Sequence, residues 1–147
     1  MRLILDNVYD NELRTFLLSQ DGIVDVNIVV QDFITEIDIK YNKSIIPKII
    51  MDYINLYKKS EYPIMLGFDS KKNDDTKVLK YVVSDLCCEY CYKALVETLF
   101  DNDNICCLKS DFSLMKPARN IEFIIEYTTG ITEEEIINLL NLESENK

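Results

Sequence analysis

Cys88 and Cys91 are the residues of this sequence whose type and spacing point most directly to chemistry. They form a C-x-x-C pair between the apolar run 78–83 and a stretch with helical periodicity. Three-residue spacing at the start of a helix places both sulfurs on one side of it. Two thiolates suit Cu(I) or another thiophilic ion, whereas a closed zinc site needs four ligands. The adjacent Cys87 is a third candidate ligand.

The position of this pair also favours the thiolate form. A cysteine near a helix N-terminus is exposed to unpaired amide N–H groups and to the helix dipole, which stabilise the thiolate. Asp85 and Glu89 oppose thiolate formation by like charge, yet they would favour a bound cation. Cys106 and Cys107 begin the next strand, at the opposite end of the expected sheet, so we expect one core and one surface residue there rather than ligands.

Two other interpretations of the pair stay open. A C-x-x-C can cycle as a disulfide, although a thioredoxin-like redox site needs a different fold and usually a proline between its cysteines. Cys91 also lies four residues before the apolar Leu95, so it fits a core position.

Composition narrows the class of protein. The 147 residues carry a net charge of −10, five cysteines and no histidine. Such an acidic chain is not expected to bind nucleic acid or an anionic membrane. The absence of histidine removes the commonest general base, so we do not expect an enzyme. The odd number of cysteines and the lack of a signal peptide or membrane-length apolar run predict a cytoplasmic protein with reduced thiols and no membrane insertion.

Hydrophobic periodicity predicts the same order of elements in both halves of the chain. The first half is read as βαββαβ, with strands over 2–8, 24–30, 35–41 and 62–68. Its first helix runs from a cap at Asp10 to a stop at Asp21-Gly22, and its second helix covers 45–57. The second half is read as βαββα, with strands over 78–83, 105–112 and 121–127 and helices over 91–99 and from 132 onward. Thr132 with Glu135 has the form of a capping box.

The two halves can be laid over each other. Leu13 and Leu17 fall on Leu95 and Leu99, and a second register, four residues longer, places Tyr41 on Tyr127. We therefore predict an α+β protein of two tandem ferredoxin-like βαββαβ units, each an antiparallel sheet with two helices on one face. The units span 1–69, without cysteines, and 78–147, with a linker over 70–77. The second unit lacks an obvious last strand, which would leave an unpaired sheet edge.

The second unit resembles the heavy-metal-associated domain of copper chaperones and metal-pumping ATPases. That family carries G-M-x-C-x-x-C after its first strand, then I-x-x-x-L in a helix and G-V-x-x-V at a strand start. Leu86 to Cys91 falls on M-x-C-x-x-C, Leu95 and Leu99 fall on the helix pair, and 104–108 falls on the strand start. The resemblance covers residues 78–142 and implies a soft-metal site at Cys88 and Cys91, with a metal-transfer protein as partner.

This chain departs from the family pattern in four ways. Asp85 replaces the glycine, Leu86 replaces the methionine, Cys87 occupies the variable position, and the last strand is missing. In the first half, Asp6 and Tyr9 would occupy the cysteine positions if no residues were inserted.

Two functions follow from these patterns. The first is a copper-like metal-binding module that acts as a chaperone or sensor. The alternative is a tandem ferredoxin-like structural, regulatory or dimerisation module that binds no metal, with an unknown ligand and a homodimer formed through sheet edges.

Overall fold

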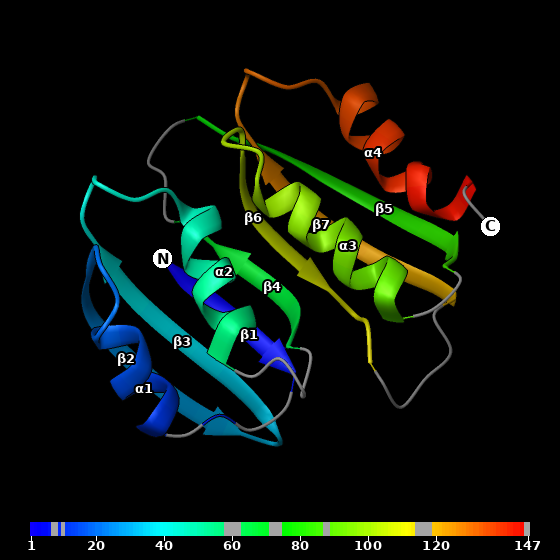
Figure 1. Ribbon diagram of the computed structural model, residues 1–147. Coiled ribbons are helices and arrows are strands. Elements are labelled where there is room, and N and C mark those ends of the chain that lie inside the picture. The colour runs from blue at the N-terminus through cyan, green and yellow to red at the C-terminus, as the bar shows by residue number, and fades with distance from the viewer. Residues whose placement is uncertain are drawn as a thin grey trace. The chain divides into compact units, whose positions relative to one another are not determined.

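The computed structural model describes residues 1–6, 9, 11–57, 63–70, 75–86, 89–113 and 119–145. Within these residues the chain is α+β, with four helices and seven strands (Figure 1). The hydrogen-bonding order of the strands is β2-β3-β1-β4-β6-β7-β5. The predicted α+β class and order of elements are confirmed, but the sheet is larger than the two separate sheets that we expected.

The elements follow the expected sequence along the chain. In the first half they are β1 (Arg2–Asp6), α1 (Asn11–Leu18), β2 (Ile23–Gln31), β3 (Ile34–Tyr41), α2 (Pro47–Tyr57) and β4 (Ile64–Asp69). In the second half they are β5 (Lys77–Asp85), α3 (Glu89–Phe100), β6 (Ile105–Ser110), β7 (Arg119–Tyr127) and α4 (Glu133–Glu145). The chain divides into two compact units, Met1–Met65 and Leu66–Lys147.

The sheet is larger than expected because β4 pairs with β6. The second part of this strand pairs antiparallel with β6, with Phe68 opposite Leu108 and Asp69 opposite Cys107. Most side chains of β4 are buried, on both of its faces. A strand that is apolar on both faces is more stable inside a sheet than at its edge. Pairing with β6 gives β4 such an interior position.

The first unit builds its core between one sheet face and two helices. Thr35, Ile37 and Ile39 of β3 alternate inward, and β1 contributes Leu3 and Leu5, all essentially buried. The helices α1 and α2 contact each other and lie on the same face of β1 to β3 (Figure 1). The charged residues of β1 and β3 lie on the opposite face, because alternate residues of a strand point to opposite sides.

The second unit repeats this packing with α3 and α4 on one face of β5 to β7 (Figure 1). The predicted cap of α4 is confirmed, since the amide of Glu135 donates to Thr132 Oγ1 at 3.2 Å and that hydroxyl donates to Glu135 Oε1. No strand follows α4 in the described part of the chain, so β5 ends the strand order of this unit.

Candidate functional site

Cys91 lies in the first turn of α3, as the periodicity predicted, and its side chain is half-buried. It is disulfide-bonded, which differs from the reduced thiols that we expected, whereas Cys106 and Cys107 are free thiols. Cys87 and Cys88 lie outside the described residues.

Tyr92 anchors the helix turn that carries Cys91. Its side chain is fully buried, and its ring stacks on Phe112 with centroids 3.8 Å apart and planes 8° from parallel. The ring centroid of Phe123 lies 6.0 Å from that of Tyr92, and the Tyr92 hydroxyl is hydrogen-bonded to Ser110 Oγ. Because successive helix residues are rotated by about 100°, the neighbouring Cys91 lies at the boundary between the core and water, where an ion can reach it.

The charged side chains of α3 bear on how electropositive the start of this helix is. Lys93, the only basic residue of this helix, is almost buried, and its Nζ lies 2.9 Å from Glu97 Oε1. Since that ammonium is already paired with a carboxylate, the helix N-terminus is the main positive field expected near Cys91. Leu86, which precedes the cysteines in the sequence, is buried with 3% of its surface exposed, so its side chain belongs to the core.

The cysteine pair lies in a segment that is longer in the second unit than in the first. Arg2 and Lys80 lie opposite equivalent positions of β3 and β7, and Leu13 and Leu95 are equivalent in the helices. The stretch between these landmarks is four residues longer in the second unit. The 12 residues of α3 against 8 in α1 account for this difference at the helix start.

The first unit therefore has no counterpart of the cysteine pair, and the ungapped alignment with Asp6 and Tyr9 is wrong. Asp6 ends β1, and Tyr9 is 2% exposed. The amide of Tyr9 donates to the buried Thr35 Oγ1 at 3.0 Å, which places this residue in the core of its unit. Helical periodicity aligned α1 with α3 correctly. It contained no signal that the strands before these helices, β1 and β5, align in a register that differs by four residues.

Cys106 and Cys107 are both buried, which corrects the expectation that one of them faces water. The pairing of β6 with β7 shifts register between Ile105 and Cys107, and such a bulge breaks the strict alternation of faces that the expectation assumed. Burial, followed by the nearby Asp69 and Glu126 carboxylates, raises the pKa of Cys107 from its ordinary value of 9.0 to about 11. The thiol stays neutral near pH 7, and a neutral thiol is a poor metal ligand.

Within the part of the chain that the structure describes, no three histidine, cysteine, aspartate or glutamate side chains are arranged to hold an ion. None of the described helices combines the length and the apolar character that a membrane-spanning helix requires.

Comparison of the chain with protein families, with curated proteins and with solved structures found no match.

Proposed function

We propose that this protein binds a soft metal ion, Cu(I) or another thiophilic ion, through Cys88 and Cys91, with Cys87 as a third candidate ligand. The observation that carries the proposal is the position of Cys91, half-buried in the first turn of α3 and three residues after Cys88 in the sequence. At this spacing in a helix start two sulfurs share one side, where two thiolates can chelate one thiophilic ion. The protein would be a binding module rather than an enzyme.

The arrangement of strands supports the same proposal. In the first unit β1 and β3 are neighbours and β2 lies outside β3, while in the second unit β5 and β7 are neighbours and β6 lies outside β7. This is the order of a ferredoxin-like βαββαβ fold, in which the first and third strands are central. We infer two tandem ferredoxin-like units, of which the second lacks its last strand and resembles the heavy-metal-associated domain.

In this function the protein acts as a chaperone or sensor in the cytoplasm, where thiols remain reduced. It would exchange its ion with a metal-transfer protein by passing the ion from thiolate to thiolate. The half-buried position of Cys91 suits such an exchange, because an incoming sulfur must reach the ion.

The test is a competition titration of the fully reduced protein with Cu(I) in the presence of a coloured Cu(I) chelator. We expect about one ion per chain, as two thiolates suit one Cu(I). The double variant Cys88→Ser/Cys91→Ser should lose this binding. Cys107→Ala is the matched control and should retain it, because that thiol is buried and neutral. Unchanged affinity in the double variant would show that the site is elsewhere.

The second candidate function is a tandem structural or regulatory module that binds no metal and dimerises. It is favoured by the strands that end the order of the two units, β2 and β5. It predicts a dimer in analytical ultracentrifugation but no competition with the Cu(I) chelator, so the titration separates the candidates.

A further inference from the structure

The outer edge of β2 is the most apolar exposed segment of the first unit. Val24, Val29 and Val30 are 60%, 57% and 42% exposed, and Phe33, in the turn that follows, is 79% exposed. The strand ends the order of the sheet and carries a single charged residue, Asp25. Such an edge readily accepts another strand unless something blocks it.

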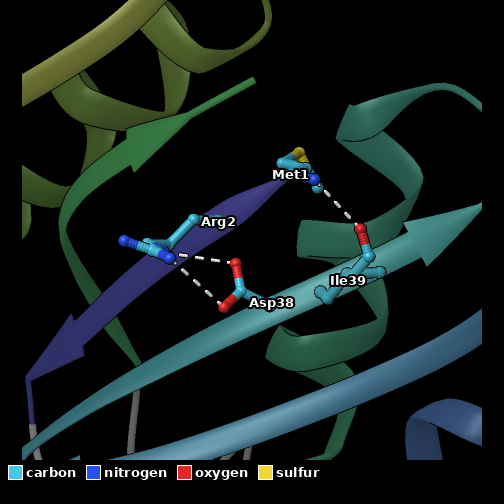
Figure 2. A network of polar contacts seen from close by, with 4 residues as sticks. All are labelled: Met1, Arg2, Asp38 and Ile39. Atoms are coloured by element: carbon cyan, nitrogen blue, oxygen red, sulfur yellow. Dashed lines mark hydrogen bonds and ion pairs between the residues drawn. The ribbon is translucent and has the colours of Figure 1, made fainter. Parts of the chain in front are cut away.

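The hydrogen bonds of Ile39 establish which backbone groups of β2 face outward. Figure 2 shows Met1 at the start of β1, and its amino group donates to the carbonyl of Ile39 at 3.0 Å. The amide of Ile39 donates in turn to the carbonyl of Met1 at 2.8 Å. Ile39 thus directs its amide and its carbonyl toward β1. Its partner on β2, Val26, therefore directs its own amide and carbonyl away from β3. By the same alternation, Ile28 and Val30 also face outward.

Side chains of the same unit occupy the outward groups of Val26. Arg14 Nε donates to the Val26 carbonyl at 2.8 Å, and the Val26 amide donates to Asp25 Oδ1 at 2.9 Å. The two side chains lie 3.8 Å apart as an ion pair. Arg14 and Asp25 therefore take the place that a neighbouring strand would fill at Val26. Among the described residues no other strand pairs with this edge from Asn27 to Gln31.

We propose that this segment, 27–31, pairs antiparallel with the same segment of a second copy of the chain, with Val29 on the two-fold axis. In this register Ile28 of each copy lies opposite Val30 of the other, so outward donors meet outward acceptors. The segment Asn-Ile-Val-Val-Gln is uncharged, which lets two chains of net charge −10 approach there. An isologous interface of this kind closes as a dimer.

The edge strand of the second unit is less suited to this role. Lys77 and Lys80 lie on β5 and are exposed, and lysines on an edge strand oppose strand addition. The proposal is independent of the metal site, since β2 belongs to the unit that has no cysteine.

Sedimentation velocity over a range of protein concentrations tests the proposal. A pairing of five residues is a small interface, so we expect a weak, concentration-dependent dimer. Amide exchange followed by NMR should show the amides of Ile28 and Val30 becoming protected as concentration rises. A protein that stays monomeric at the highest concentration, or amides whose exchange does not change, would overturn the proposal.

Three variants locate the interface. Val29→Lys places like charges on the axis and should weaken the dimer about tenfold or more, while the exposed position leaves the monomer folded. Val82→Lys on β5, whose side chain is similarly exposed at 49%, is the matched control and should not change it. Arg14→Ala frees the Val26 carbonyl for a partner strand and should tighten the dimer about fivefold. A dimer that is unaffected by Val29→Lys or Arg14→Ala, or lost in Val82→Lys, contradicts this assignment.

Discussion

Replacing Tyr92 tests whether its buried ring holds the helix turn that carries Cys91. The side chain has no exposed surface and stacks on Phe112 at 3.8 Å, so Tyr92→Ala removes a buried aromatic ring and leaves a cavity. Such a change costs about 3–5 kcal/mol of the free energy of unfolding. For a chain of this size, the loss corresponds to a decrease in Tm on the order of 10 °C.

Tyr92→Phe separates the ring from its hydroxyl. The stacked ring remains, and only the bond to Ser110 Oγ is lost. Ser110 keeps an acceptor, because its hydroxyl also donates to the Leu66 carbonyl at 3.3 Å. No buried group is left unsatisfied by this change, so we expect a cost of about 0.5–1.5 kcal/mol, toward the lower end.

Urea unfolding followed by far-UV circular dichroism measures both costs. Tyr90→Ala is the matched control, since this tyrosine lies two residues earlier in the same turn and is 57% exposed. We expect it to cost less than about 1 kcal/mol. If Tyr92→Ala were no more destabilising than Tyr90→Ala, the ring would not anchor α3 and our account of the position of Cys91 would be wrong.

Two further predictions concern the second unit. Thr132→Ala removes the acceptor of the Glu135 amide and should lower the free energy of unfolding by about 1 kcal/mol, while Thr132→Ser restores it; equal urea midpoints for all three proteins would refute this. Cys107 ionises near pH 9.0 when unfolded and near pH 11 when folded. Between these pH values the folded state holds the extra proton, so stability falls as pH rises through this window. Cys107→Ala should show a shallower fall in urea titrations from pH 8 to 11, and identical slopes would contradict the assignment.

Much of the secondary structure could be predicted because its signals are local. The alternation of apolar residues along β3 and β7 is produced by the pleat itself, so it marks both the strand and its buried face. The cap at Thr132 likewise depends on two residues that are three positions apart, Thr132 and Glu135. For the same reason the helix that begins near Cys91 could be recognised before its surroundings were known.

The candidate site was predictable only in part. The spacing of Cys88 and Cys91 and the helix that follows them indicated a pair of sulfurs on one side of a turn. The anchoring of that turn by Tyr92 was not predicted, because Phe112 and Phe123 approach it from distant parts of the chain. The four extra residues at the start of α3 were also missed, since strand register depends on pairing with β7 rather than on the strand's own residues.

The sequence by itself determined where the chain forms helices and strands, that the two halves repeat one order of elements, and which cysteines are spaced to act as a pair. Only the tertiary structure decided that β4 pairs with β6, that Cys107 is buried and neutral, and that Arg14 and Asp25 cap the edge of β2 at Val26. The physical reason is range: periodicity and capping arise among residues a few positions apart, whereas pairing, desolvation and edge protection depend on which distant segments meet.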